Sequence, residues 1–518
     1  MSRSGRIAVV AAYFTAFWVA LPAGLWLAAR ELDRWLGLEA PRRPAGWAAV
    51  AAGLGLLLWA IVALRREAGG LPVTALPPPR LATHGPYRLC RHPVYLGFDL
   101  AVLGAGLALG SPALAWIVAP LLLPAWMLYA AAEERGLERR FGDAWRSYRR
   151  RVGMLTPRFA IYWLAFAAIR LGALQCRVAG REHVPRRGGA VLVHNHASYV
   201  DFLYVAAAVA PRRPVYLVTS EAYRSPLARF LMGRGLTIPV RRYRAEPAAC
   251  REVLRLLEAG HLVVVAPEAE RATLGRRLRP LGNVARVLSR LGVPCVPVGI
   301  SGAYDVGPRW AGRLRRRPVS VRVGPPVDLT GPDPAAALDA ALGALVERDP
   351  QPVHLEGLDR RRLERVVWRC PRCLAEPAWR PAELSCDACG ARWTPTADGL
   401  LEGPDGVRSA LADVAAPVWA AAEASPLRAR GAAGRERSMF GPIEPLVPLG
   451  TVALEVGPRG LTFDGRALAA HEVRSVGVER NDTLQVATRD GMWQFRLAAG
   501  SVFRLELALV RWCRGTGR

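Results

Sequence analysis

Four apolar runs near the start of the chain constrain its fold more than any other feature. They cover residues 7–29, 45–64, 94–109 and 113–131, and Gly110-Ser111-Pro112 separates the last two. A membrane core takes about 20 apolar residues per helix. The runs therefore predict an α-helical transmembrane domain over residues 1–157, in which the short third run is tilted or interfacial. A cleaved signal peptide is the alternative for the first run, and the later runs argue against it.

Arginine-rich segments beside these runs predict the orientation. The segment 133–151 follows the fourth run and is dense in Arg. Such segments stay in the cytoplasm, so four spans place the N-terminus there as well. We expect everything after Pro157 on the cytoplasmic side of a bacterial inner membrane. A further apolar stretch, 159–174, contains Arg170 and favours an interfacial or re-entrant helix.

The chain is strongly basic, with 70 basic against 43 acidic residues and a net charge of +27. Every basic residue is Arg, and many lie beside apolar stretches. A membrane surface accounts for that arrangement, so we expect membrane lipids and not nucleic acid as partners. Five of the nine cysteines are scattered singly, which suits a reducing cytosol and not a disulfide framework.

Short β-type runs alternate with helical segments from residue 178 onward. The strand-like runs are AVLVHN, PVYLVT, LTIPV, HLVVVAPE, VPCVPVGI and VSVRVG. Such alternation is typical of an α/β domain. We expect this domain over residues 158–355, with the helical segment DPAAALDAALGALVER near its end.

His196 and Asp201 stand where the first of these strands turns into a helix. An alcohol that attacks a thioester must lose its proton, and neutral imidazole is a base suited to neutral pH. A carboxylate on the other ring nitrogen would fix the tautomer and stabilise the imidazolium. A second interpretation remains open on these residues alone, because Ser198 and Asp201 also fit a helix N-cap. His196 would then be a turn residue.

Four blocks, in order, resemble the glycerolipid acyltransferases of the lysophosphatidate and glycerol-phosphate type. They are HxxxxD at 196–201, GLTIPVR at 235–241, APEAERA at 266–272 and VPCVPV at 293–298. The resemblance covers about 159–347 and implies that His196 is the general base and that Asp201 orients it. It implies acyl-CoA or acyl carrier protein as the acyl donor. It also places in the substrate site Arg241, Glu268, Arg271 and Pro297.

The third block departs from the family pattern F-P-E-G-T-R-S. Ala269 stands in place of Gly, and Glu270 in place of Thr. A Cβ at position 269 is expected to hinder close backbone approach, and Glu270 adds a negative charge where a phosphate would sit. A less charged acceptor than lysophosphatidate is therefore an open alternative. Arg241 and Arg271 could also be solvated surface charges instead of phosphate ligands.

The stretch HGPYRLCRHPVYLG at 84–97, the pair Glu133-Glu134 and the tail at 141–152 resemble integral-membrane methyltransferases. That family includes isoprenylcysteine carboxyl methyltransferases and phospholipid N-methyltransferases. The resemblance covers about 7–157 and implies S-adenosylmethionine as cofactor, bound without a Rossmann fingerprint. The implied cofactor residues are Arg91, His92, Tyr95, Glu133 and Glu134. In the alternative interpretation these charges only fix the ends of spans, and the domain is an anchor.

Two CxxC pairs, Cys370/Cys373 and Cys386/Cys389, are separated by twelve residues. Four thiolates at this spacing suit tetrahedral structural zinc, so we expect a zinc ribbon over 356–402. Four Cys ligands leave no open position, so this zinc should not be catalytic. A redox role for either pair is the alternative.

The remaining sequence predicts a linker over 403–449, rich in Ala, Gly, Pro and Arg, and a β-rich domain over 450–518 that is similar to a small PH-like barrel.

Taken together, the chain is expected to be a membrane-bound acyltransferase that acylates a lysophospholipid-like hydroxyl, with a second activity in S-adenosylmethionine-dependent methylation. The alternatives are a protein that is primarily a membrane methyltransferase, and a non-enzymatic membrane scaffold.

Overall fold

The computed structural model describes residues 11–12, 14–70, 78–155, 175–220, 223, 237–241, 246–376, 378–423, 425–436, 446–479, 481–489 and 491–515. The chain divides into two compact units, residues 1–160 and 161–518, and each is described by itself. The expectation of several domains is confirmed, because the second unit combines an α/β sheet, small Cys-rich sheets and a C-terminal β-sheet.

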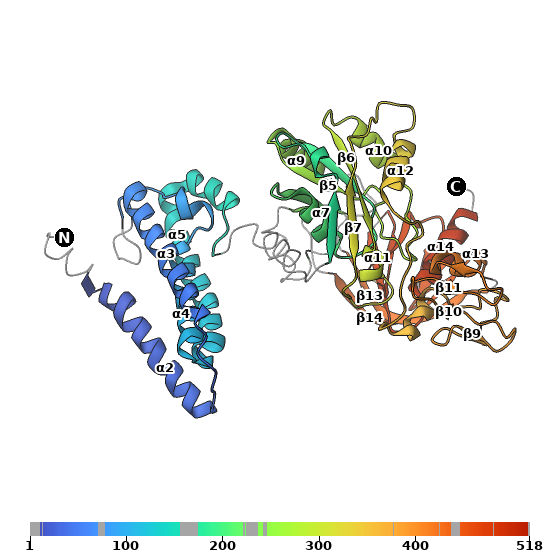
Figure 1. Cartoon of the computed structure of the whole chain (residues 1–518). Helices are drawn as coiled ribbons and strands as arrows, with labels where there is room; N and C mark the ends of the chain where they lie inside the picture. Colours follow the sequence, from blue (N-terminus) through green and yellow to red (C-terminus); the bar gives the residue numbers. More distant parts are fainter. Residues whose placement is uncertain are drawn as a thin grey trace. The chain divides into compact units, whose positions relative to one another are not determined.

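The first unit is built of helices (Figure 1). They are η1 (Ala16–Ala20), α2 (Leu21–Leu36), α3 (Ala45–Ala68), η2 (Gly85–Arg88), α4 (Pro93–Leu109), η3 (Leu114–Val118) and α5 (Ala119–Arg151). Gly110 takes a φ of 73° and ends α4. The expected break between the third and fourth apolar runs is therefore present, because only glycine adopts that backbone conformation without strain.

Helices α3 and α4 pack closely through small residues. A Cβ added at Gly53 would lie 2.6 Å from Ala101 N, and one added at Gly104 would lie 2.6 Å from Val50 N. Small residues that let two backbones approach are typical of helix pairs in membranes. This contact holds α4, whose first turn carries Tyr95 of the candidate cofactor site.

Two of the described helices are long and apolar enough to cross a membrane, Ala45–Ala68 and Leu114–Arg149. The third expected span is α4, which is apolar but has only 17 residues. The first expected span lies partly outside the described residues, and its described part continues as α2 to Leu36, beyond the expected end at Ala29. The expected interfacial helix at 159–174 lies outside the described residues.

The α/β part of the second unit contains a seven-stranded sheet with the order β1-β7-β6-β2-β5-β3-β4. Its strands are β1 (Cys176–Ala179), β2 (Ala190–His194), β3 (Pro214–Thr219), β4 (Thr237–Val240), β5 (Leu262–Val265), β6 (Cys295–Ser301) and β7 (Val319–Val323). Its helical elements are η4 (Arg181–His183), α7 (Asp201–Val209), α9 (Pro247–Glu258), α10 (Gly282–Ser289), α11 (Ala303–Val306) and α12 (Pro334–Leu345). All the strand pairs are parallel except β6 with β7.

Strand β2 lies in the centre of this sheet, between β5 and β6, and is buried along its whole length. Leu192 packs in one core with Tyr204 of α7, whereas Val191 packs in another core with Leu256 of α9 and Leu338 of α12. A strand covered on both faces needs a continuous apolar sequence, which AVLVH supplies. Because β2 and β5 are parallel neighbours, the loops that follow them lie at the same edge of the sheet.

The Cys-rich part of the second unit contains short elements. They are η6 (Arg360–Arg365), β8 (Trp379–Arg380), β9 (Ser385–Cys386), β10 (Thr394–Pro395), β11 (Leu401–Glu402), β12 (Arg408–Ser409) and α13 (Leu411–Ala420). Strand β12 pairs with β11, so the small sheet continues past residue 402, where we expected the ribbon to end.

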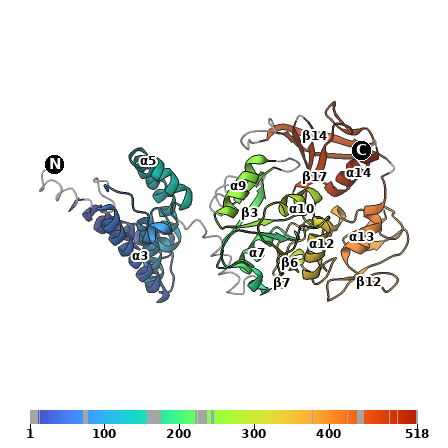
Figure 2. The ribbon, with the colours of Figure 1, turned by 90° about the horizontal axis from the view of Figure 1, so that it is seen from above.

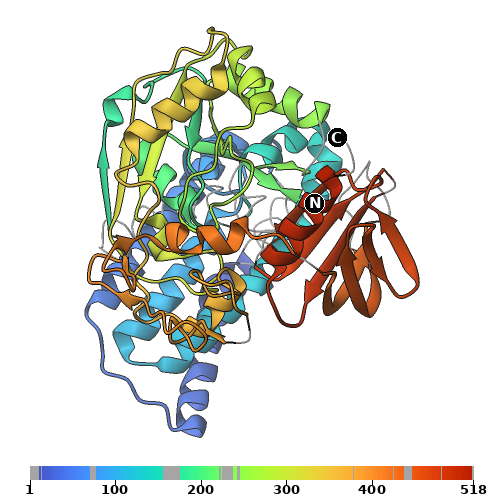
Figure 3. The same ribbon diagram turned by 90° about the vertical axis from the view of Figure 1, so that its right-hand side faces the viewer.

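The C-terminal sheet has seven strands in the order β16-β15-β14-β13-β19-β18-β17. Figure 2 shows two of its strands, β14 and β17, close to α14. They are β13 (Leu427–Arg435), β14 (Val447–Gly457), β15 (Gly460–Phe463), β16 (Arg466–Ala469), β17 (Ser475–Glu479), β18 (Thr483–Ala487) and β19 (Met492–Leu497), and α14 (Val502–Gly515) follows. Figure 3 shows α14 lying along this sheet. One hydrophobic core contains Val296 of the α/β part, Trp393 of the Cys-rich part and Phe503 of α14.

The expectation of a linker over 403–449 is wrong for its described residues, because they include α13 and β13. Strand β13 lies in the middle of the C-terminal sheet, between β14 and β19. Its sequence, LRARGAAGR, lacks the large β-branched residues by which strands are usually predicted. Small residues are needed there, because a Cβ added at Gly431 would lie 2.4 Å from Arg496 O. Strands β1 and β16 were also not predicted.

Candidate active sites

His196 and Asp201 lie in the turn between β2 and α7. The imidazole Nδ1 of His196 lies 2.8 Å from Asp201 Oδ2. The same carboxylate oxygen accepts hydrogen bonds from the backbone N–H of Ala197 at 2.8 Å and of Ser198 at 2.9 Å. The Asp201 side chain is 1% exposed and that of His196 is 26% exposed. The histidine can therefore reach a substrate, while the buried carboxylate sets its orientation.

The N-capping alternative is only partly realised. Val200 occupies the N-cap position of α7 and makes no side-chain capping bond, and the Ser198 hydroxyl donates to Gly307 O at 3.4 Å instead. The carboxylate of Asp201, in the first turn of the helix, accepts the Ser198 N–H. Asp201 thus closes the turn and holds His196 with the same oxygen, so the two interpretations do not exclude each other.

The surroundings of this pair are strongly desolvated. Burial raises the pKa of Asp201 to about 6, although the backbone N–H groups of Ser198 and Ala197 favour the ionised form. Burial lowers the pKa of His194 to about 4, so this ring is neutral at pH 7. Ligand atoms of His194, His196 and Asp201 lie within 4.8 Å of one another. A metal ion bound through Nδ1 of His196 would have to break its bond to Asp201.

The third block forms the loop after β5 and is tied to the His196 turn. Ala272 N donates to His196 O at 2.8 Å. Glu268 is buried, and its Oε2 accepts from Leu278 N at 3.3 Å. Burial raises the pKa of Glu268 to about 8, so this carboxyl is protonated at neutral pH. Its role in holding the acceptor stays a prediction.

Two of the four departures from the family motif, at positions 269 and 270, have visible structural counterparts. Ala269 takes a φ of 54°, the left-handed conformation that glycine adopts without strain. The Glu270 carboxylate does not stand alone, because its Oε1 lies 2.5 Å from Nη1 of Arg309. Neither feature was visible in the motif itself.

The predicted substrate residues occupy different parts of the sheet. The guanidinium carbon of Arg271 lies 3.5 Å from the ring centroid of Tyr199, in the turn between His196 and Asp201. Arg241 follows β4, three strands away from β2, and its Nε lies 3.9 Å from Glu246 Oε1. Pro297 is buried within β6, and its carbonyl accepts from Gly324 N. The structure brings Arg271 to the His196 turn, and the roles of Arg241 and Pro297 stay predictions.

In the first unit, the five predicted cofactor residues form one polar cluster between the start of α4 and the middle of α5. Tyr95 Oη donates to Glu133 Oε2 at 2.8 Å. His92 lies between the two carboxylates, 3.4 Å from Glu133 and 3.3 Å from Glu134. Arg91 contacts Glu134 at 2.7 Å and also donates to the carbonyl of Arg149.

This cluster lies against aromatic rings. Tyr95 stacks on Trp126 with centroids 5.0 Å apart and an interplanar angle of 7°. Glu133 keeps 41% of its side chain exposed, whereas Glu134 is buried against Arg91. A carboxylate beside stacked aromatic faces fits a cation such as a sulfonium or an ammonium. Trp126 is not predicted from the sequence, since an aromatic residue in an apolar run carries no separate signal.

The four cysteines of the CxxC pairs come together. Cys370 Sγ lies 3.7 Å from Cys389 Sγ, and Cys373 Sγ lies 3.7 Å from Cys386 Sγ. All four sulfurs lie within 4.8 Å of one another. A tetrahedral site with Zn–S bonds of about 2.3 Å requires sulfurs about 3.8 Å apart, whereas a disulfide requires about 2.05 Å. The spacing therefore fits a zinc ion and excludes paired disulfides.

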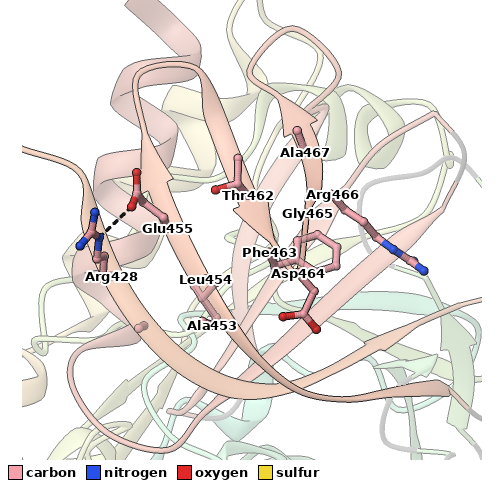
Figure 4. Close-up of a pocket in the computed structure, with 11 residues that line it drawn as sticks. Arg428, Ala453, Leu454, Glu455, Thr462, Phe463, Asp464, Gly465, Arg466 and Ala467 are labelled. Carbon is pink, nitrogen blue, oxygen red and sulfur yellow. Dashed lines mark hydrogen bonds and ion pairs between the residues drawn. The ribbon is translucent and has the colours of Figure 1, made fainter.

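A surface hollow of about 420 Å³ lies on the C-terminal sheet, over β14, β15 and β16 (Figure 4). Arg428 and Glu455 form an ion pair of 2.8 Å at its side, and Asp464 and Arg466 line its other end. None of the residues predicted from the sequence lines this hollow. It is separate from the chemistry of the His196 turn.

Comparisons with known proteins match two segments of the chain. Residues 175–301 match the protein family described as Acyltransferase, and residues 42–144 match the family described as Phospholipid methyltransferase. Methanethiol S-methyltransferase 1 of Bradyrhizobium diazoefficiens is 39% identical over 80 residues, which are 15% of this chain and 27% of that protein.

Curated acyltransferases are also similar to this chain. The 1-acyl-sn-glycerol-3-phosphate acyltransferase of Limnanthes douglasii is 27% identical over 159 residues, 29% of this chain and 54% of that protein. The enzyme of the same name from Bacillus subtilis is 23% identical over 127 residues, 24% of this chain and 62% of that protein. The chain thus spans between 27% and 62% of the length of these curated relatives.

Among solved structures, the 1-acyl-sn-glycerophosphate (LPA) acyltransferase PlsC from Thermotoga maritima is similar to 43% of this chain and 93% of its own, with 22% identity and a TM-score of 0.32. Both resemblances that the motifs indicate are confirmed by the family matches. The chain therefore contains a domain of the Acyltransferase family at residues 175–301, preceded by a domain of the Phospholipid methyltransferase family at residues 42–144.

Proposed function

We propose that the second unit transfers an acyl group from a thioester, acyl-CoA or acyl carrier protein, to the hydroxyl of a lysophospholipid. The observation that carries this proposal is the bond of 2.8 Å between His196 Nδ1 and the buried Asp201 carboxylate. An oriented imidazole that remains accessible is what a general base for an alcohol requires.

The geometry suggests how the reaction proceeds. With its Nδ1 proton donated to Asp201, His196 carries its lone pair on Nε2. That nitrogen takes the proton of the acceptor hydroxyl as the hydroxyl oxygen attacks the thioester carbonyl carbon. The C–S bond then breaks, and the leaving thiolate receives the proton from the imidazolium. Asp201 stabilises the positive charge that His196 carries between the two proton transfers.

Arg271 is the group best placed to bind a phosphate of the acceptor. Its guanidinium lies over Tyr199, within the turn that carries His196. Stacking on an aromatic ring leaves the edge of a guanidinium able to donate to phosphate oxygens in a planar fork. This arrangement favours an acceptor whose phosphate lies close to the hydroxyl that is acylated.

Transfer of a labelled acyl group tests the proposal. Purified full-length protein is given labelled acyl-CoA or acyl carrier protein together with lysophosphatidate, and the lipid product is measured. His196→Ala should abolish the product, whereas His183→Ala, a change of a half-buried histidine in η4, should leave it intact. Full transfer by the His196→Ala variant would exclude His196 as the base.

A second activity is proposed for the first unit, the transfer of a methyl group from S-adenosylmethionine. Glu133, beside the stacked rings of Tyr95 and Trp126, supports this proposal. Glu133 and His92 would hold the cofactor, and when bound it supplies an electrophilic methyl group. Arg91 would keep Glu134 ionised and fixed, since it contacts that carboxylate at 2.7 Å.

Binding of labelled S-adenosylmethionine tests this second activity. Glu133→Gln should weaken binding by at least tenfold, because it removes the carboxylate beside the cation site. Glu138→Gln is the matched control, since Glu138 is a carboxylate of similar exposure in the same helix. Equal binding by both variants would exclude the proposed cofactor site.

We also propose that the first unit is embedded in a bacterial inner membrane and that the second unit lies in the cytoplasm. The apolar helices Ala45–Ala68 and Leu114–Arg149 and the Arg-rich segment 133–151 support this arrangement. A protease added outside intact cells should leave the second unit uncut, and the same protease should cut it in inverted membrane vesicles. Cleavage in intact cells would show the opposite orientation.

A further inference from the structure

Glu270 is the residue of the third block that differs most from the family motif, and it has a defined partner. Its Oε1 lies 2.5 Å from Nη1 of Arg309. Arg309 follows α11, and its side chain is 2% exposed, whereas 27% of the Glu270 side chain is exposed. A buried guanidinium thus meets a carboxylate that reaches the surface of the site.

The position of Arg309 is set from the C-terminal domain. Its Nη2 donates to the carbonyl of Val478 in β17. Its guanidinium carbon also lies 5.3 Å from the ring centroid of Phe503 in α14. Phe503 is fully buried in the core that the C-terminal sheet shares with the α/β part. Arg309 therefore joins the α/β part to the C-terminal domain, and its partner Val478 lies 169 residues further along the chain.

The pair lies next to the group that we assign to the acceptor phosphate. Glu270 is followed directly by Arg271, which lies over Tyr199 in the turn of His196. An ionised carboxylate beside this arginine would oppose an anionic acceptor. At an effective dielectric constant of about 20, the repulsion between two like charges about 10 Å apart raises the dissociation constant by roughly a factor of ten or more.

We infer that Arg309, held by the C-terminal domain, neutralises Glu270 and thereby allows the acceptor site to bind a phosphate-bearing lysophospholipid. This inference rests on the proposed function of the second unit. Arg309 is in this view a positioning and specificity-determining residue and not a catalytic one, because it acts on the acceptor through Glu270. The acidic substitution in the motif then does not require an uncharged acceptor.

Two acceptors and a set of variants separate this role from a purely structural one. Dissociation constants of lysophosphatidate and of monoacylglycerol are measured for the full-length protein in detergent at pH 8, together with kcat and KM for each. The variants are Arg309→Met, Glu270→Thr and the double variant. Arg317→Met is the control, because Arg317 is another arginine beside a carboxylate, 3.5 Å from Asp305, with 26% of its side chain exposed.

Arg309→Met should weaken the binding of lysophosphatidate roughly tenfold or more and leave that of monoacylglycerol nearly unchanged. Glu270→Thr should bind lysophosphatidate at least as tightly as the wild type. The double variant should recover wild-type binding, because the uncompensated charge is gone. A structural role predicts instead that both acceptors are affected and that the double variant is not rescued.

Equal losses for both acceptors in Arg309→Met, or a double variant as weak as Arg309→Met, would overturn the inference. A charge-dependent change in binding without acyl transfer by the wild type would refute the proposed function and leave the inference standing. Acyl transfer by the wild type with unchanged charge selectivity in the variants would do the reverse.

Discussion

His196 Nδ1 lies 2.8 Å from Asp201 Oδ2, and the two side chains differ sharply in exposure, 26% against 1%. The same carboxylate oxygen also accepts two backbone N–H groups of the turn. One buried oxygen therefore fixes the backbone of the turn and the tautomer of the histidine together. This coupling makes the orientation of the base a property of the local fold.

Asp201→Asn should reduce the rate of acyl transfer by roughly 10³- to 10⁴-fold, because an amide cannot stabilise the imidazolium and favours the wrong tautomer. The amide also accepts more weakly from the N–H groups of Ala197 and Ser198, so some stability is lost as well. The measurement is kcat together with the thermal midpoint. A rate within threefold of the wild type would show that Asp201 only closes the turn.

Glu268 should make the second unit less stable as the pH rises. Its pKa is about 8 in the folded protein against 4.5 as a free side chain. Between pH 4.5 and 8 the folded state therefore keeps a proton that the unfolded state has already lost. The contribution is full below pH 4.5 and declines through this window by several kcal/mol at most.

The test compares the thermal midpoints of the wild type and of Glu268→Gln at pH 5 and at pH 8. A glutamine does not titrate, so the midpoint of the variant should fall less than that of the wild type over this range. Parallel changes in the two proteins would contradict the neutral, buried state of Glu268.

Ala269→Gly should stabilise the second unit by about 0.5–1 kcal/mol. Glycine removes the cost of the left-handed conformation, and its greater freedom in the unfolded chain offsets part of that gain. The matched control is Ala272→Gly in the same loop, which should destabilise, since Ala272 is buried and has no positive φ. Chemical denaturation measures both, and a loss of stability in Ala269→Gly would contradict the strain at this position.

Cys373→Ser should release a bound zinc ion, because it removes one of the four thiolates whose sulfurs converge in the structure. Elemental analysis of the purified protein should give about one zinc per chain for the wild type and much less for the variant. Cys250→Ser changes another exposed cysteine, in α9, and should keep the metal. Equal zinc in both variants, or no zinc in the wild type, would rule out the ribbon site.

The sequence predicts the centre of the α/β sheet well, because β2 and β5 are buried on both faces and must be continuously apolar. It also predicts the turn that joins His196 to Asp201, since both residues lie within one local connection. In the first unit, His92 precedes α4 and Glu133 lies within α5, so no local connection joins them, and their proximity was expected only from the family resemblance.

The features that were not predicted depend on contacts between distant segments. Strand β13 is central because β14 and β19 pair with it, although its own small residues carry no strand signal. The partner of Glu270 is Arg309, which is in turn held by Val478 and Phe503. No local pattern in the sequence links these four residues, so the charge compensation at the third block appears only in the folded chain.

The rate of acyl transfer from a labelled thioester to lysophosphatidate by His196→Ala, relative to the wild type, tests the central claim most directly. Zinc content and S-adenosylmethionine binding of the same preparation show that each unit is folded. The proposed mechanism predicts a loss of at least 10³-fold with both controls unchanged. A variant that transfers the acyl group at the wild-type rate would contradict it.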